Sequence, residues 1–219
     1  VSELRLLVGT IDIRGAQPGA TIQISGKNHG EYPPVKPIRV PAGNHVVRVF
    51  KSGYQPFETT IDVAGGDVAF VKAKLARLTD SGKLQVREQT GRVVEVLVDG
   101  IPVGKTPYTD TVSVGSHVVV LRGIGKIGSP PAAAIVKSQE TTTLSLLAEA
   151  LEASLQVNPT PPGASVWINS VNVGNGVWLG RLKTGDHKVD VKSDGFLTAS
   201  RDVKLARGKR ETLDVALER

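Results

Sequence analysis

The four histidines of the chain are the side chains best suited to acid–base or metal chemistry. Three of them, His45, His117 and His187, lie 72 and 70 residues apart. Each follows a glycine by two positions, in the patterns "GNHVV", "GSHVV" and "GDHKV". A neutral imidazole donates one hydrogen bond and accepts another, and it also binds metal ions. The regular spacing indicates one unit repeated along the chain.

The alternation of apolar residues predicts which way these histidines face. Successive side chains of a strand point to opposite sides, so His45 shares the inner face with Val47 and Val49. The same parity places His117 and His187 inward. A metal site needs ligands that converge, and three separate units do not easily bring theirs together. We therefore expect the three histidines to tie turns to neighbouring backbone, and we expect no metal or cofactor.

The elements that position these histidines repeat in the same order. Each copy opens with a short alternating strand, passes through a glycine turn into a second strand, and ends with another alternating strand. The 24 glycines and 13 prolines separate short runs rich in Val, Ile and Thr, as in β proteins. The pattern predicts an all-β fold of three tandem small antiparallel β-sandwich modules with short linkers, at residues 1–79, 80–152 and 153–219.

The repeated motifs resemble the PEGA family of bacterial β modules. The resemblance rests on the Gly-x-His turns and on Pro18-Gly19-Ala20, Pro162-Gly163-Ala164, Asp99-Gly100, Gly104-Lys105-Thr106-Pro107 and Gly53-Tyr54. It covers essentially the whole chain. It implies immunoglobulin-like or transthyretin-like sandwiches outside the bacterial membrane, in the periplasm or at the cell surface. It implies no catalytic residues.

Composition and charge narrow the classes of partner. With no cysteine, the chain has neither disulfides nor thiolate metal sites. The net charge of +6 divides over the three copies as +4, −1 and +3, without the concentrated basic stripe of a nucleic-acid-binding protein. No nucleic-acid partner is therefore expected. No apolar run is long enough for a membrane span. Because the chain does not begin with methionine, we expect it to be a fragment of a longer protein.

The densest basic stretch is "KLARGKRE", which begins at Lys204 and also contains Arg207, Lys209 and Arg210. Two interpretations stay open for it. It is typical of a solvated hairpin turn between two strands, and it could also contact a polyanion.

Aromatic side chains supply the other candidate contacts. Trp167 lies on the outward face of its predicted strand, and Trp178 lies in a loop that departs from the family pattern. Tyr32 and His29 belong to an insertion in the first copy. Outward aromatics serve as protein contact points, and they also stack on sugars. A third interpretation is that Trp167 is covered within the fold.

No nucleophile, base and pocket can be assembled from these residues, so we expect no enzyme. The leading hypothesis is a non-catalytic tandem β-module that serves as a spacer or docking scaffold in a bacterial envelope or surface protein. Its partners would be a protein or other domains of the parent chain, bound through loops and strand edges. The alternative is a module that binds an anionic or saccharide envelope polymer.

Overall fold

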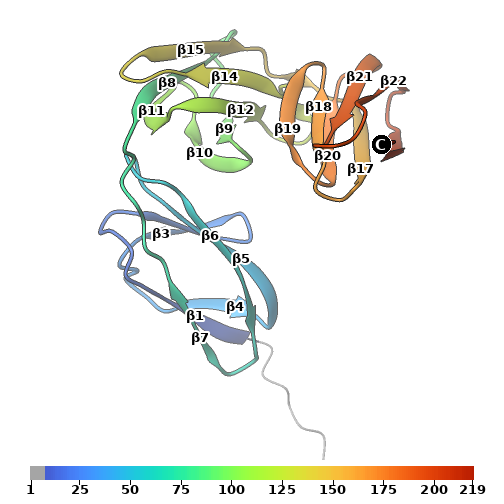
Figure 1. Cartoon of the computed structure of the whole chain (residues 1–219). Coiled ribbons are helices and arrows are strands. Elements are labelled where there is room, and N and C mark those ends of the chain that lie inside the picture. The colour runs from blue at the N-terminus through green and yellow to red at the C-terminus, as the bar shows by residue number, and fades with distance from the viewer. Residues whose placement is uncertain (1–7) are drawn as a thin grey trace, which may run out of the picture. The chain divides into compact units, whose positions relative to one another are not determined.

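The computed structural model of the chain describes residues 8–219 (Figure 1). These residues form strands, turns and loops, which confirms the predicted all-β class. No helix capable of crossing a membrane is found among them. The chain divides into a first unit, which runs to Ser81 and includes Thr111–Ser113, and a second unit of Gly82–Asp110 with Val114–Arg219.

The first unit contains one pair of sheets. A three-stranded sheet has the order β4-β1-β7, and a four-stranded sheet has the order β3-β2-β5-β6. Inward side chains of both sheets, among them Ile11, Ile22 and Val49, pack into one core. The strands are β1 (Val8–Arg14), β2 (Thr21–Ile24), β3 (Lys27–Glu31), β4 (Ile38–Pro41), β5 (Gly43–Phe50), β6 (Phe57–Val63) and β7 (Val68–Lys72).

A middle pair of sheets repeats this arrangement. Its three-stranded sheet has the order β11-β8-β15, and its larger sheet runs β10-β9-β12, with β14 paired to β12. Two short strands, β13 and β16, extend the larger sheet. The strands are β8 (Ser81–Glu88), β9 (Glu95–Val98), β10 (Ile101–Lys105), β11 (Tyr108–Ser113), β12 (Gly115–Arg122), β13 (Ile127–Gly128), β14 (Ala132–Val136), β15 (Thr141–Leu146) and β16 (Glu149–Ala150).

A third pair of sheets completes the second unit. The orders β20-β17-β23 and β19-β18-β21-β22 match those of the first pair strand for strand. Its inward residues, among them Leu155, Val166 and Leu182, form a separate core. The strands are β17 (Ala153–Thr160), β18 (Ser165–Ile168), β19 (Val171–Asn175), β20 (Trp178–Leu182), β21 (Gly185–Lys192), β22 (Ala199–Leu205) and β23 (Arg210–Ala216).

The three-stranded sheets of the first and third copies combine an antiparallel pair with a parallel one, and the predicted antiparallel modules did not include parallel pairs. The first and last strands of each copy run parallel: β1 with β7, β8 with β15, and β17 with β23. Parallel neighbours need a long connection. Here the chain supplies it by passing through the larger sheet of the copy before it returns, so the first and last strands of each copy lie side by side.

The cross-strand register places the same inward pairs in all three copies. Ile24 pairs with Val47 in the first, and Val98 pairs with Val119 in the second. In the third copy the equivalent pair is Ile168 with Val189. Each such side chain contributes about 1.5–3 kcal/mol when fully buried. The predicted inward parity of the strands that follow the histidine turns therefore agrees with the burial.

The opening strand of two copies approaches the neighbouring backbone closely. A Cβ on Gly82 would lie 2.2 Å from the Lys137 carbonyl oxygen, and a Cβ on Gly9 would lie 2.5 Å from that of Ala64. The equivalent residue of the third copy is Ala153, which is buried. The first two copies therefore require glycine at this position, whereas the third has room for a methyl group.

Candidate functional site

His45 connects the segment before β5 to the turn after β2. Its Nε2 lies 2.7 Å from the Pro41 carbonyl oxygen, and its Nδ1 lies 3.1 Å from the Ser25 hydroxyl. Because a carbonyl oxygen only accepts, Nε2 carries the proton and donates it, and the Ser25 hydroxyl donates to Nδ1. Both ring nitrogens of this half-buried imidazole are thus occupied within the first unit.

His187 has the same arrangement in the third copy. The Asn169 side-chain amide donates to its Nδ1 over 2.9 Å, and its Nε2 donates to the Lys183 carbonyl over 2.9 Å. In the middle copy, Nδ1 of His117 donates to the Asp99 carboxylate over 2.7 Å. Both of these imidazoles are buried. Each histidine therefore contacts the turn that follows the second strand of its own copy.

The turn residues that contact the histidines share one backbone conformation. Ser25, Asp99 and Asn169 have φ values of 49°, 51° and 48°, in the left-handed region. In each case the next residue also has a positive φ, as tight hairpin turns require. Within residues 8–219, no three histidine or carboxylate side chains gather as a metal site. We predict that the histidine contacts hold these turns in place.

Tyr32 and His29 both lie in the first unit but have different surroundings. Tyr32 packs against the core, and its backbone N–H donates to the Ala20 carbonyl over 2.7 Å. His29 is half-buried on β3 beside a hollow of about 330 Å³. Burial, reinforced by the Lys27 ammonium, lowers the pKa of His29. A partner at this hollow would therefore meet a neutral imidazole near neutral pH.

Trp167 lies half-buried on the outward face of β18. The Lys192 ammonium stands 4.3 Å from the centre of its ring, and its indole N–H donates to the Ser165 hydroxyl over 3.2 Å. One ring face and the polar edge are thus already in use within the third copy.

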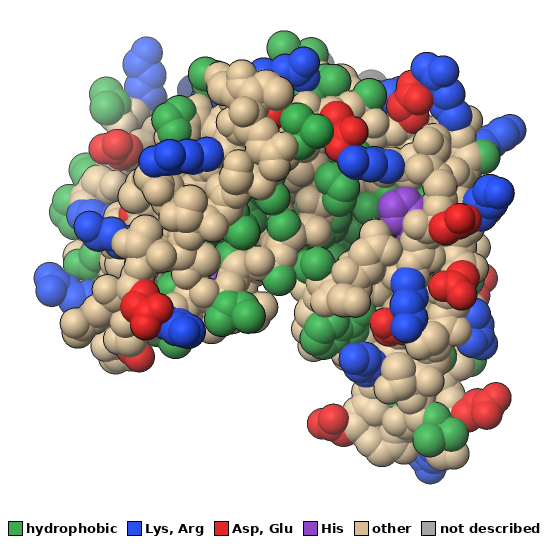
Figure 2. All heavy atoms as spheres, turned by 90° about the horizontal axis from the view of Figure 1, so that it is seen from above, with side chains coloured by type: hydrophobic (Ala, Val, Ile, Leu, Met, Phe, Trp, Pro, Cys, Tyr) green, Lys and Arg blue, Asp and Glu red, His purple; other side chains and the backbone are tan. Residues whose placement is uncertain are grey.

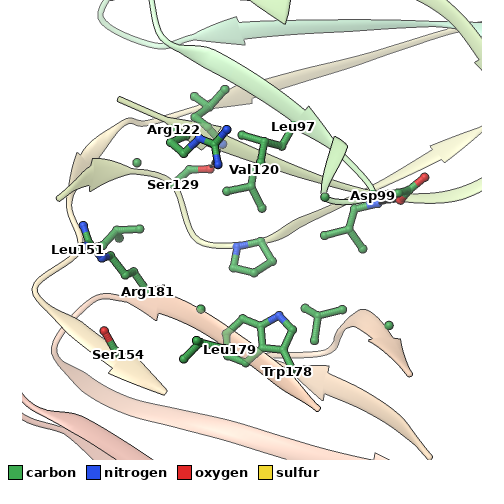
Figure 3. A pocket seen from close by; sticks show the side chains of 18 of the residues that line it. Leu97, Asp99, Val120, Arg122, Ser129, Leu151, Ser154, Trp178, Leu179 and Arg181 are labelled. Atoms are coloured by element: carbon green, nitrogen blue, oxygen red, sulfur yellow. Dashed lines mark hydrogen bonds between the residues drawn. The ribbon is translucent and has the colours of Figure 1, made fainter. Parts of the chain in front are cut away.

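Trp178 opens strand β20 rather than lying in a loop as predicted, and it lines a groove of about 960 Å³ in the second unit. Its ring lies directly over Gly180, where a Cβ would come within 2.3 Å of the ring. The close-up shows Trp178 and Leu179 on one wall, and Leu97 and Val120 on the wall opposite (Figure 3). We call this feature the apolar groove.

The two walls of the apolar groove come from different copies. One wall is the outward face of β9 and β12, with Leu97, Val118 and Val120. The other wall is formed by β19 and β20, with Val173 beside Trp178 and Leu179. On the face drawn in Figure 2, hydrophobic side chains gather where the surface is hollowed, and Lys and Arg side chains stand around them.

Polar contacts join the middle and third copies at the groove and beside it. The Arg181 guanidinium donates to the Gly125 carbonyl over 2.5 Å, and Lys183 forms an ion pair with Glu149. Strand β19 also lies against β12 and β14. The segment between the copies is extended, because β16 pairs with β13 immediately before β17 begins.

The basic cluster predicted from the sequence lies where β22 turns into β23. Lys204, Arg207, Lys209 and Arg210 are all exposed. Arg207 forms an ion pair with Glu152 at 2.7 Å. Arg210 is the member of the cluster that lines the apolar groove, beside Ser154. The structure therefore brings two predicted contact residues, Trp178 and Arg210, to one surface, and it leaves Trp167 outside that surface.

Sequence reasoning did not identify the first wall of the groove. Its signal is the run "HVVVLR", in which apolar residues occupy both faces of the strand. Val119 and Leu121 fill the core, and Val118 and Val120 are left for the outward face. The third copy reads "HKVDVK" at the same place, with polar residues outward.

Comparison with known proteins identifies the architecture. A sequence profile of the PEGA domain matches residues 8–78 and 152–219. The middle copy is not part of the match, although its sheets repeat the same strand order apart from the added β13 and β16. A comparison with curated proteins finds no match.

Several solved structures share a distant likeness with the chain. The Bacillus anthracis TIE protein is 14% identical, with 96% of this chain and 51% of that chain covered and a TM-score of 0.27. This chain thus spans about half the length of that structure. The major pilin subunit of Bacillus cereus is 12% identical, covering 97% and 100%, with a TM-score of 0.24. A streptococcal ancillary pilin is 10% identical, covering 83% and 77%, with a TM-score of 0.22.

The family match and the recurring sheet order agree with the resemblance drawn from the Pro-Gly-Ala and Gly-x-His motifs. The match covers more than half of the residues, in the first and third copies. The chain belongs to the PEGA domain family.

Proposed function

We propose that the chain is a non-catalytic tandem β-module that spaces and docks other proteins in a bacterial envelope or surface protein, outside the cytoplasmic membrane. The observation that carries this proposal is a strand order that recurs in three copies, with two short strands added in the middle one, while the outward faces differ. A scaffold that repeats while its surface varies is suited to holding several contacts at set positions. We propose that its three modules have the bounds expected from the sequence, 1–79, 80–152 and 153–219.

The outward surface supports protein docking better than saccharide binding. Lys192 already stands over one face of the Trp167 ring and Ser165 accepts from its N–H, so that face and that edge are not free to contact a sugar. Trp178 faces Leu97 and Val120 across a groove whose opposed side chains are mainly apolar. Apolar walls with an aromatic anchor are typical of the centre of a protein interface.

The test is affinity capture from a solubilised bacterial envelope fraction, with the full 219-residue chain as bait. Wild type runs beside a Trp167→Ala, Trp178→Ala double variant, at low and at high salt. We expect wild type to retain an envelope protein that the double variant loses. Retention of a polymer alone, and only at low salt, would favour the polymer-binding alternative. A bait that retains no protein under any condition would refute docking.

A further inference from the structure

The apolar groove has a shape that suits one class of partner. Its walls oppose each other, with Leu97 and Val120 above and Trp178 and Leu179 below in the close-up (Figure 3). An extended peptide projects successive side chains to opposite sides. Such a peptide could place apolar side chains against both walls at once. A groove of about 960 Å³ is also at the upper end of the range for binding pockets, so it has room for a segment of several residues.

The lower wall offers backbone groups in addition to side chains. Strand β19 is the edge of one sheet of the third copy, and β20 is the edge of the other. An edge strand carries a row of N–H and C=O groups that its own sheet does not pair. Extended peptides bind such edges by adding a strand, with side-chain pockets for selectivity. Leu179, on β20, is 54% exposed beside this edge.

The charges around the groove define the chemistry of the partner. Five charged residues line it: Asp99, Arg122, Lys126, Arg181 and Arg210. Asp99 is paired with His117, and Arg122 is paired with Glu95 at 2.7 Å.

The remaining three charges of the groove are all positive. In the part of the chain that the structure describes, no carboxylate forms an ion pair with Lys126, Arg181 or Arg210. A partner that brings acidic groups to this rim would complement it. A second copy of this chain, with a net charge of +6, would be a poor occupant.

We propose that the apolar groove binds an extended segment of a protein partner in which apolar side chains alternate and acidic residues flank them. This inference rests on the docking function proposed above and names the class of segment that docks. The apolar walls select the alternating side chains, the edge strands β19 and β20 supply backbone hydrogen bonds, and the basic rim selects the acidic flanks.

The experiment measures fluorescence polarisation of a labelled synthetic peptide with alternating leucine and serine between paired glutamates. A second peptide carries lysines in place of the glutamates. Two groove variants of the full chain are compared with wild type: Leu179→Ser, and Lys126→Glu combined with Arg210→Glu. The matched controls are Leu197→Ser, whose leucine is 64% exposed outside the groove, and Arg201→Glu combined with Lys72→Glu, which changes the net charge equally. Circular dichroism of each variant checks that it folds.

We expect the acidic peptide to bind wild type and both controls, and to bind each groove variant about tenfold more weakly or worse, equivalent to about 1.4 kcal/mol. Binding should also weaken in 1 M salt, where the screening length falls to about 3 Å. Equal binding to groove variants and controls would overturn the proposal, as would a preference for the lysine peptide. Tighter groove-dependent binding of dextran sulfate, or of phosphatidylglycerol vesicles, would overturn it in favour of a polymer or a lipid surface.

The envelope capture separates failure of this inference from failure of the docking function. The two groove variants are added to that experiment as baits. If they retain the same envelope protein as wild type while no peptide binds the groove, docking stands and the groove assignment is wrong. If wild type retains no envelope protein, the docking function itself fails.

Discussion

The outward faces of the larger sheets of the middle and third copies occupy equivalent positions but differ in chemistry. Leu97 pairs with Val120 across β9 and β12, whereas Trp167 pairs with Asp190 across β18 and β21. The middle pair is apolar and faces a groove. The pair in the third copy combines an amphipathic tryptophan with a charged aspartate. Equivalent positions in the two copies thus carry surfaces of different chemistry.

The third copy satisfies its outward face with its own side chains. Lys192 covers the Trp167 ring, and the Ser200 hydroxyl donates to the Asp190 carboxylate over 2.5 Å. The middle copy has no such polar partners at Leu97 and Val120, and the edge strands of the third copy cover them only in part. The comparison indicates that inward pairs build the core of each copy, whereas outward pairs can differ in chemistry from copy to copy.

The largest expected effect tests the inward half of this comparison. Leu121 is 1% exposed, and Leu121→Ala should lower the free energy of unfolding by about 2–5 kcal/mol through lost burial and a cavity. Leu97→Ala, on the outward face of the same sheet, should cost only about 1 kcal/mol. Urea denaturation followed by circular dichroism measures both. Equal losses would contradict the division of the sheet into a structural and a variable face.

A second prediction concerns the opening strand, where the copies differ by one methyl group. Gly82→Ala would place a Cβ against the Lys137 carbonyl and should destabilise the protein by about 1–3 kcal/mol. Gly163→Ala is the control, because nothing lies within 4 Å of a Cβ there. The same denaturation assay applies. If Gly82→Ala left the free energy of unfolding unchanged, β8 would be able to move away from Lys137. The middle copy could then accommodate a methyl group as the third copy accommodates that of Ala153.

The histidine contacts should contribute less. His187→Ala leaves the Lys183 carbonyl and the Asn169 amide without their partner, and we expect a loss of about 1–2 kcal/mol. His29→Ala, outside the repeated pattern, serves as the control and should be close to neutral. Thermal unfolding of the two variants side by side measures the difference. If His29→Ala cost as much as His187→Ala, the turn-fixing role of the repeated histidines would be wrong.

The sequence allowed much of the fold to be predicted because alternation reports burial directly. Val47, Val119 and Val189 lie inward as their parity indicated. The direction of strand pairing could not be predicted in the same way. A period of two residues tells which side of a strand is buried but not which strand lies beside it. The parallel pairs of first and last strands therefore emerged only from the structure.

The candidate site could be predicted only in part, for a related reason. Trp178 and Arg210 were identified as exposed contact residues, but their meeting in one groove depends on how β19 and β20 lie against the middle sheet. The hydrogen bond from Arg181 to Gly125 spans 56 residues of sequence and leaves no local pattern. Leu97 belongs to the wall that the sequence did not reveal, and its place in the groove depends on the opposite wall.

The middle and third copies also differ at Glu88. It is 6% exposed at the end of β8, where the third copy buries Pro159. Its carboxylate accepts the N–H of Ala148 at 3.0 Å, together with the N–H and hydroxyl of Thr90 and the N–H of Arg92. These bonds, led by that of Ala148, lower the pKa of Glu88 from 4.5 to about 2.

The last prediction uses this depressed pKa to separate the copies by pH. The ionised form is favoured in the folded protein, so Glu88 contributes stability above pH 4.5 that is lost as the pH falls toward about 2. Glu88→Gln should therefore lower the urea midpoint at pH 7 and leave it nearly unchanged near pH 2. Glu211→Gln, at an exposed carboxylate of the third copy, should change neither. If the urea midpoint of Glu88→Gln stayed below that of wild type by the same amount from pH 7 to pH 2, the loss would come from the geometry of the amide and not from the missing charge. The ionised carboxylate would then not be what holds Ala148 and the turn at Thr90 together.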